Sequence, residues 1–364
     1  MNSIRWCTDT INVTRGCVPV SEGCALCYAA RQATRFAGPG LPFEGLAAGG
    51  FWTGRVGYFP DQMDKARKAR TPQVYFVDSM SDLFIEVNSS DLILEVFEMM
   101  RALPQHQFVI LTKRVDRMAA WLSWYQRQME QRDLGFGECA VLPNVWLGFS
   151  AENQERFDSR MRAAHTAKEL GWHVIASLEP LIGAISIAST PYDLDWVIVG
   201  GESGGLDARP MHTAWARDLM VESIERGIPF FFKQQGEYEA RELTPEERFQ
   251  YDNDDFRETN PYKLNRIASW TTLSSTEPGE RGKVKHLFFD EGGNVAGVME
   301  RRKHKSRQVL TLDGITHEDA PAPIAFALRA ENLRYAKAQG MKAKRGAPAK
   351  RIGKSTPIGE GVFA

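Results

Sequence analysis

Short apolar runs alternate with amphipathic segments along the first two thirds of this 364-residue chain. Each run holds a few consecutive residues of Val, Ile, Phe, Trp or Leu, which is short for a helix and typical of a strand buried on both faces. The predicted strands lie in QVYFVD (73–78), QFVILTKR (107–114), NVWLGFS (144–150), WHVIASLEP (172–180), DWVIVGGES (195–203) and IPFFFKQ (228–234).

Three segments between these runs carry helix signals. Residues 89–104 open with Ser and Asp, which cap helices, and stop at a proline, while residues 152–171 and 213–227 each end at a glycine. Repeated alternation of strand and helix predicts parallel strands joined by right-handed crossovers. Such strands form either a closed or partly closed barrel or an open doubly wound sheet.

Polar residues follow the apolar runs directly, and in both architectures ligands bind at the carboxyl ends of the strands. We therefore expect these residues to line one mouth. They are Asp78, Ser79, Lys113, Arg114, Ser150, Glu152, Glu179, Glu202, Ser203, Lys233 and Gln234. By contrast, Tyr28, Trp146, Trp196 and Phe230 to Phe232 fit strand and core packing, and His212 fits the start of a helix.

The stretch GCVPVSEGCALCY (16–28) places three cysteines in the order C-x6-C-x2-C. A first strand is expected at residues 10–16, so this loop leaves it toward the same mouth, and a helix then resumes at Cys27. The chain has five cysteines, an odd number without an export signal, which favours metal or redox chemistry over a disulfide framework.

Three interpretations of the cysteines are open from the residues alone. A zinc site would need a distant histidine as fourth ligand, since Cys7 and Cys139 form no second C-x2-C pair. Three unrelated buried thiols are the plainest explanation. The third is a 4Fe–4S cluster held by three thiolates, which leaves one iron open for a substrate or cofactor.

A three-cysteine loop after a first strand, followed by an aromatic residue and a series of βα units, resembles the radical S-adenosylmethionine (SAM) superfamily. More closely, the chain resembles a family of three-cysteine proteins from phages and bacteria. The shared phrases span residues 1 to about 240, although the first cysteine gap departs from the three-residue gap of most radical SAM enzymes. They are GCVPVSEGCALCYA (16–29), FVDSMSDLF (76–84), LTKRVDRM (111–118), NVWLGFSAEN (144–153), SLEPLIG (177–183), VGGESG (199–204), ARPMH (208–212) and PFFFKQQGE (229–237).

The resemblance implies an α/β fold, a partial (β/α) barrel of parallel strands. It implies that Cys17, Cys24 and Cys27 hold a 4Fe–4S cluster whose open iron binds SAM, and that an electron donor starts the radical chemistry. The candidates for SAM binding are Ser79, Ser81, Asp82, Ser150, Glu152, Gly200 and Gly201, where the two glycines would let the backbone approach the ligand. Glu202 and Lys113 are the candidates for catalysis.

Charge is divided unevenly along the chain. Residues 301–364 hold 14 Lys and Arg against 5 Asp and Glu, a net +9, so the total of −1 leaves −10 for residues 1–300. A basic tail suits contact with a phosphate backbone, although a solubilising tail would look the same. The candidates for nucleic-acid contact are Arg114, Arg117 and Arg209 near the mouth and Lys342, Lys344 and Arg345 in the tail.

We expect a barrel in residues 1–240, an extension with a β-hairpin in residues 241–312 (the strands within 284–312, the turn at DEGGN), and a helix and basic flexible tail in residues 313–364. No apolar run approaches the roughly 18 residues of a membrane span, and the N-terminus lacks a signal-peptide pattern. The expected location is the cytoplasm, that of the host cell if the chain is phage-encoded.

The resemblance also implies a reaction. Proteins of this phage family occur with enzymes that elaborate thymine in viral DNA, which points to an isomerase that rearranges N-linked to C-linked glycinylthymidine and so protects the DNA from restriction. A lyase acting on a thymine photoproduct and an RNA-modifying enzyme are alternatives within the superfamily. A metal-stabilised nucleic-acid-binding module is the alternative from another class.

Overall fold

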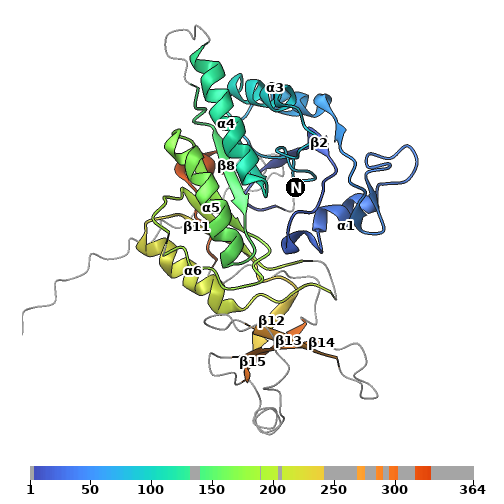
Figure 1. Cartoon of the computed structure of the whole chain (residues 1–364), viewed down its shortest axis with the longest axis vertical. Helices are drawn as coiled ribbons and strands as arrows, with labels where there is room; N and C mark the ends of the chain where they lie inside the picture. Colours follow the sequence, from blue (N-terminus) through green and yellow to red (C-terminus); the bar gives the residue numbers. More distant parts are fainter. Residues whose placement is uncertain are drawn as a thin grey trace, which may run out of the picture.

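A computed structural model describes residues 4–131, 140–188, 190–203, 207–241, 269–274, 284–289, 295–301 and 316–328 (Figure 1). Seven strands form one sheet in which every neighbouring pair is parallel and the spatial order equals the chain order. They are β1 (Asp9–Ile11), β6 (Val74–Val77), β7 (Gln107–Thr112), β8 (Val145–Ser150), β9 (His173–Leu178), β10 (Trp196–Gly200) and β11 (Phe230–Gln234).

An order without reversal decides between the two predicted architectures. Right-handed crossovers between consecutive strands place all the helices on one face, so the sheet winds in one direction and curls. A doubly wound sheet would reverse its order at a switch point. Since β1 and β11 are the two edges of the sheet, the protein is an open half-barrel, and the predicted partial (β/α) barrel is confirmed.

Four helices cover the outer face: α3 (Ser90–Arg101), α4 (Val115–Glu130), α5 (Gln154–Glu169) and α6 (Thr213–Glu225). Figure 1 shows α4, α5 and α6 in a row in front of the sheet. Side-chain caps fix the starts of three helices, since Ser89, Asn153 and His212 accept hydrogen bonds from backbone N–H groups of the first turns. The prediction that His212 starts a helix is confirmed.

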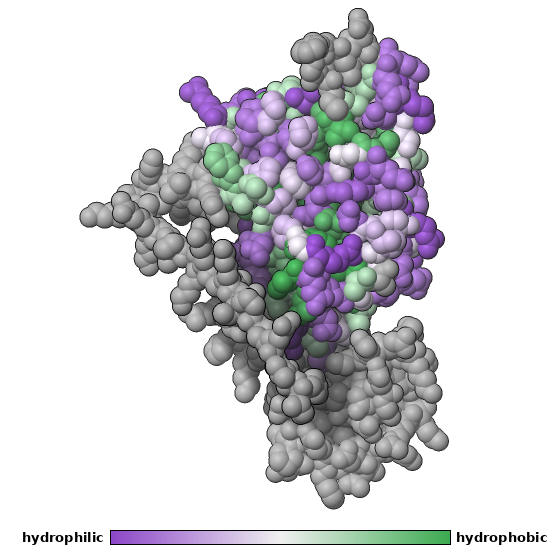
Figure 2. All heavy atoms as spheres, turned by 90° about the vertical axis from the view of Figure 1, so that its left-hand side faces the viewer, coloured by the Kyte–Doolittle hydropathy of each residue, from purple (hydrophilic) through white to green (hydrophobic). Residues whose placement is uncertain are grey.

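Side chains alternate between two apolar clusters along each strand. On β8, Val145, Leu147 and Phe149 pack under the helices, while Trp146 faces the inner side of the half-barrel. The buried positions of Trp146, Trp196 and Phe230 to Phe232 agree with their predicted packing roles. The face on the left of Figure 1 is mainly hydrophilic with hydrophobic patches (Figure 2), as amphipathic helices require.

Residues 316–328 complete the inner face. Their backbone bonds to β11, with Phe232 N–H donating to the His317 carbonyl at 2.8 Å and Asp319 N–H to the Phe230 carbonyl at 3.1 Å. The helical residues 322–328 then place Ile324 and Ala327 in the inner cluster beside Trp6. A segment some 90 residues downstream of β11 in the sequence therefore supplies part of the core of the half-barrel.

The expected first strand at residues 10–16 is instead two strands. After β1 the chain leaves the sheet, and β2 (Thr14–Arg15) pairs with β5 (Gly57–Tyr58). Residues 28–72, here called the N-terminal insert, hold α1 (Tyr28–Thr34), β3 (Ala47–Ala48), β4 (Phe51–Trp52), β5, the 3-10 helix η2 (Pro60–Met63) and α2 (Asp64–Lys68).

A four-stranded antiparallel sheet follows the half-barrel, in the order β12 (Tyr238–Arg241), β15 (Val295–Arg301), β14 (Val284–Phe289) and β13 (Ser269–Ser274). The predicted hairpin is confirmed as the β14–β15 pair, and β12 and β13 were not predicted. Lys342, Lys344 and Arg345 lie outside the described residues. Within the described part of the chain, no helix is long and apolar enough to cross a membrane.

Replacing Ile324 by Ala should lower the free energy of unfolding by about 2–4 kcal/mol, because this side chain is fully buried against the inner face. Phe326→Ala is the matched control, since Phe326 is 68% exposed on the same helical segment and should cost no more than about 0.5 kcal/mol. Urea denaturation measures both. Equal effects of the two substitutions would show that residues 322–328 do not pack on the barrel.

Candidate functional site

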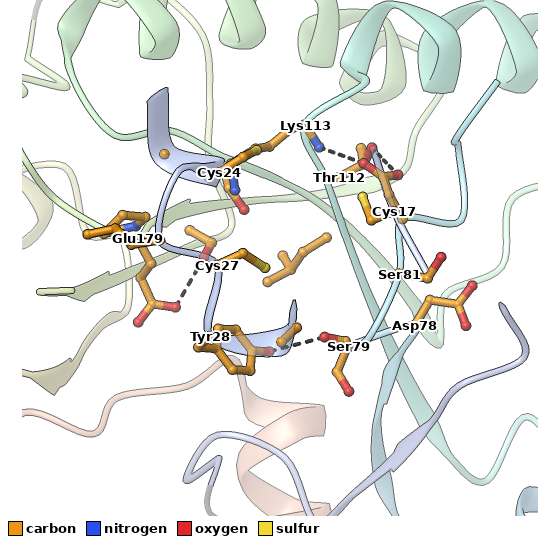
Figure 3. Close-up of a pocket in the computed structure, with 18 of the residues that line it drawn as sticks. Cys17, Cys24, Cys27, Tyr28, Asp78, Ser79, Ser81, Thr112, Lys113 and Glu179 are labelled. Atoms are coloured by element: carbon orange, nitrogen blue, oxygen red, sulfur yellow. Dashed lines mark hydrogen bonds between the residues drawn. The ribbon is translucent and has the colours of Figure 1, made fainter. Parts of the chain in front are cut away.

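A pocket opens at the carboxyl ends of the parallel strands (Figure 3). Ten of the eleven residues predicted to line the mouth do line it, and Glu152 is the exception. The prediction succeeds because the strands are parallel, so residues that follow consecutive strands meet at one edge. Residues that the sequence did not single out also form its wall, among them Trp6, Trp52, Phe76, Leu111 and Ser177.

Cys17, Cys24 and Cys27 all line this pocket as free thiols. They belong to the cysteine loop, residues 16–28, whose regular structure is limited to the 3-10 helix η1 (Glu22–Cys24) and the first residue of α1. The loop begins at Gly16, which has a left-handed φ of 97° and where a Cβ atom would lie 2.1 Å from the Arg55 carbonyl oxygen. Only glycine fits at this position.

Arg114 anchors the first part of the cysteine loop. Its Nη2 donates to the Val18 carbonyl at 2.9 Å, and its Nη1 lies 4.0 Å from the Cys17 sulfur. Two carboxylates balance its charge, Asp82 at 3.2 Å and Glu86 at 2.8 Å. Burial raises the pKa of the Cys17 thiol to about 12, with the nearby Asp82 charge adding to the rise and Arg114 opposing it.

Glu152 anchors the middle of the loop from behind. Its Oε1 accepts the Gly23 N–H at 3.2 Å, and its Oε2 pairs with Arg160 at 2.7 Å. A Cβ atom on Gly23 would lie 2.9 Å from the Glu152 carboxyl carbon, so the contact requires glycine. The predicted place of Glu152 at the mouth is wrong, because its fully buried carboxylate is used by the loop and by Arg160.

Glu202 lines the pocket, but its carboxylate is engaged by Arg209, with Nη2 2.5 Å from Oε1 and Nε 2.9 Å from Oε2. Arg209 in turn donates from Nη1 to the Glu22 carbonyl at 2.9 Å. The Glu22 side chain accepts hydrogen bonds from Asn153 at 2.6 Å and from Arg156 at 3.1 Å. Glu202 thus reaches the cysteine loop through Arg209. Its predicted catalytic role stays a prediction.

The three arginines predicted to contact nucleic acid all have partners inside the protein. Arg114 and Arg209 hold the cysteine loop, and Arg117 donates to the carbonyls of Phe84, Ile85 and Asn88. Only Arg114 of the three lines the pocket. Their contact with nucleic acid stays a prediction, and these internal bonds account for their presence without it.

Five of the seven candidates for SAM binding line the pocket: Ser79, Ser81, Asp82, Ser150 and Gly201. Several of these polar groups are shared with the protein. The Ser81 hydroxyl donates to the Gly16 carbonyl at 2.6 Å, and the Ser79 hydroxyl donates to Asn12 Oδ1 at 3.1 Å. Asp82 accepts from the Thr112 hydroxyl at 2.6 Å. Lys113, the other catalytic candidate, also lies in the wall of the pocket.

Contacts within the protein account for glycine at positions 200 and 201, and their predicted contact with SAM stays a prediction. A Cβ atom on Gly200 would lie 2.4 Å from Glu179 Oε1, and one on Gly201 would lie 2.2 Å from the Gln235 carbonyl oxygen. The protein itself fills the space that both glycines leave. At Gly200 this space lets Glu179, which follows β9, cross β10 and pair with Lys233 of β11 at 3.1 Å. Both charges of this pair line the pocket.

Tyr28 differs from its expected role, and Asp78 lines the mouth as predicted but with its carboxylate engaged by the protein. Tyr28 was assigned to packing, but it is 44% exposed in the pocket wall and its hydroxyl donates to the Ser79 carbonyl at 3.1 Å (Figure 3). Asp78 is buried with a left-handed φ of 56° and accepts from the Thr14 N–H at 2.9 Å and hydroxyl at 2.7 Å. Burial raises the pKa of Asp78 to about 7, although the Thr14 hydrogen bonds oppose the rise.

The donor set discriminates between the metal interpretations. Among the residues that the structure describes, no three His, Cys, Asp or Glu side chains are placed to hold a metal ion, and no histidine lines the pocket. Zinc gathers its ligands around a single ion about 2.3 Å from each sulfur. Three thiolates that bind different irons of one cluster gather around a group larger than a single ion, so their sulfurs lie farther apart. Three thiols on one pocket wall therefore fit a cluster better than zinc.

A family model described as "Protein of unknown function (DUF5131)" matches residues 1–321, so the chain belongs to this family. No curated protein matches it. Three solved structures of spore photoproduct lyase are similar to it: a cysteine-to-serine variant (13% identity, TM-score 0.35), a doubly substituted variant with bound AdoMet and dinucleoside spore photoproduct (12%, 0.35) and a cysteine-to-alanine variant (11%, 0.36). Each of the three matches covers 90% of this chain and 73% of the lyase chain. TM-scores of this size establish neither fold nor chemistry, and the fold follows from the strand order.

Replacing Glu152 by Ala should lower the free energy of unfolding by about 3–5 kcal/mol, because Arg160 would keep a buried charge without its partner. The control is Glu155→Ala three residues further on, in the first turn of α5, where the side chain is 82% exposed and the change should be within about 0.5 kcal/mol. Urea denaturation gives both values. A loss for Glu152→Ala no larger than the control's would contradict the anchoring role.

Asp78 should make stability depend on pH. Its folded-state pKa of about 7 lies above the ordinary value of 3.8, so the folded protein binds the extra proton between these values. The contribution of Asp78 to the free energy of unfolding should therefore fall as pH rises through this window. The stability of Asp78→Asn relative to the wild type should therefore increase between about pH 4 and about pH 7 and then level off. A difference that stays constant across this range would refute the shift.

Proposed function

We propose that this chain is a radical SAM enzyme in which Cys17, Cys24 and Cys27 hold a 4Fe–4S cluster. The observation that carries the proposal is the position of these three thiols, together on the wall of a pocket at the carboxyl ends of a half-barrel of parallel strands. When bound, such a cluster supplies the electron that cleaves SAM and starts radical chemistry, while the protein positions the reactants.

The residues around the thiols suit this role. The backbone of the cysteine loop between Cys17 and Cys24 is held by three charged side chains, Arg114, Glu152 and Arg209, of which the first two are buried. Preorganised ligands of this kind depend on the residues behind them. The pocket beside the thiols offers Ser79, Ser81, Asp82 and Ser150 as polar contacts for SAM, together with Lys113.

For the reaction, we propose an isomerase that converts N-linked to C-linked glycinylthymidine in phage DNA, on the resemblance of phrases such as FVDSMSDLF and VGGESG to the phage family. Its partners are DNA with modified thymine and an electron donor. Hydrogen abstraction at a glycyl carbon is a reasonable first step, because the neighbouring nitrogen and carbonyl stabilise the resulting radical. The Glu179–Lys233 pair in the pocket would offer an acceptor and a donor to the polar groups of such a substrate.

Anaerobic reconstitution with iron and sulfide tests the cluster. The wild type should take up about four irons per chain and release 5′-deoxyadenosine from SAM when reduced. Cys24→Ala should lose SAM cleavage entirely, whereas Cys139→Ala, outside the C-x6-C-x2-C motif, should keep the wild-type rate. A colourless protein that holds one zinc would support a binding module instead, and an equal loss in Cys139→Ala would overturn the three-ligand assignment.

The reaction is tested by the masses of nucleosides released after incubation with DNA. With phage-type DNA that carries N-linked glycinylthymidine, the enzyme should yield a nucleoside of unchanged mass and altered retention time. Ultraviolet-irradiated DNA is the parallel substrate. Restored thymidine from that DNA, with no change in the glycinyl nucleoside, would replace the isomerase by a photoproduct lyase.

A further inference from the structure

We propose that the β3–β4 hairpin and the adjoining end of α1 form a stacking surface for unpaired bases of a single-stranded nucleic acid, beside the pocket. The stacking surface consists of Phe36 and Phe51 with the guanidinium groups of Arg31, Arg35 and Arg55. The inference rests on the proposed function, because it provides the surface that holds a strand while one of its bases enters the pocket.

The hairpin is short and its tip is fixed. Ala47 pairs with Trp52 and Ala48 with Phe51, and both turn residues, Gly49 at φ 59° and Gly50 at φ 89°, are left-handed. Two left-handed residues are typical of the tight two-residue turn that matches strand twist. The Gly50 N–H donates to the Thr34 hydroxyl of α1 at 3.1 Å. The hairpin tip is therefore tied to the helix that follows the cysteine loop.

Consecutive residues of β4 face opposite sides, as in any strand. Trp52 packs against the small cluster around Ala29 and Ala47 and lines the pocket. Phe51 is 64% exposed, and Phe36, two residues after Thr34, is 48% exposed. A single exposed ring is ordinary, but two exposed rings on α1 and the hairpin tied to it offer faces on which bases can stack.

Three arginines belong to the same segment of the chain as these rings. Residues 28–59 contain three arginines and a single acidic residue, Glu44, so their net charge is +2. Residues 1–300 together carry a net charge of −10. Arg31 Cγ lies 3.7 Å from the point that a Cβ atom on Gly50 would occupy. Arg55 Nη1 lies 3.6 Å from the point that a Cβ atom on Gly45 would occupy. Arg31 is also 3.7 Å from Asp207, an exposed carboxylate.

Exposed rings and guanidinium groups on one short segment of the chain supply the two things that single-strand binding requires, which are base stacking and neutralisation of phosphate. A protein partner or a second copy of this chain would use the rings but gains nothing specific from the local excess of arginine. Trp52, on the opposite side of β4 from Phe51, lines the pocket, so a strand bound on this surface would lie directly outside that part of the pocket wall. Nucleic acid is therefore the occupant that the charge and the rings favour together.

Fluorescence anisotropy with a labelled single-stranded oligothymidine of about ten nucleotides tests the inference. Phe51→Ala should weaken binding by roughly 5- to 150-fold, the value of one stacked base, and Phe51→Trp should restore it. Phe326→Ala, which removes an equally exposed ring elsewhere, should bind as the wild type does. Arg35→Gln should reduce the slope of log affinity against log salt by about one unit.

Unchanged affinity in Phe51→Ala, or no binding by the wild type, would overturn the inference. A loss of self-association in Phe51→Ala, seen by analytical ultracentrifugation without a change in anisotropy, would assign the surface to a second copy and equally overturn it. SAM cleavage without DNA is measured on the same preparations. It distinguishes failure of the stacking surface from failure of the proposed function. If the protein cleaves SAM and Phe51→Ala binds DNA as the wild type does, only the stacking surface is rejected. If DNA binding depends on Phe51 but the protein holds no cluster, only the proposed enzymatic function is rejected.

Discussion

The hydrogen bonds between charged side chains and the cysteine loop are the interaction on which the site depends. The loop has little regular structure, and its backbone is held by Arg114, Glu152 and Arg209, whose partners Val18, Gly23 and Glu22 lie 96, 129 and 187 positions away in the sequence. Each of the three is also paired with an opposite charge. Because an unpaired charge inside the protein is costly, these pairs hold the three side chains in place, and the loop cannot shift without losing its hydrogen bonds to them. The half-barrel thereby sets the positions of the three sulfurs.

Much of the architecture could be predicted, because period and length distinguish buried strands from the amphipathic helices between them. The mouth followed from the same reasoning, since Lys113, Glu179 and Lys233 each come directly after or at the end of a strand. The division of the first strand into two could not be predicted, because β2 pairs with β5, which lies within the N-terminal insert. Nor could the contribution of Ile324 to the inner core, which depends on a long-range pairing of residues 316–320 with β11.

Roles of individual residues were harder to predict than positions. Arg209 looked like a free cation because its partners, Glu202 and the Glu22 carbonyl, are identified only by the folded chain. Gly200 looked like an opening for a ligand, but the space is occupied by Glu179 on its way to Lys233. In both cases the residue type correctly indicated a close contact. The sequence could not show that the partner belongs to the protein itself.

The most direct test of the central claim is the electron paramagnetic resonance spectrum of the anaerobically reconstituted, dithionite-reduced protein, recorded with and without SAM. An iron that lacks a protein ligand can bind SAM, so the account predicts a reduced cluster whose spectrum changes when SAM is added. A cluster whose spectrum is identical in both samples, or reconstituted protein without a cluster signal, would contradict it.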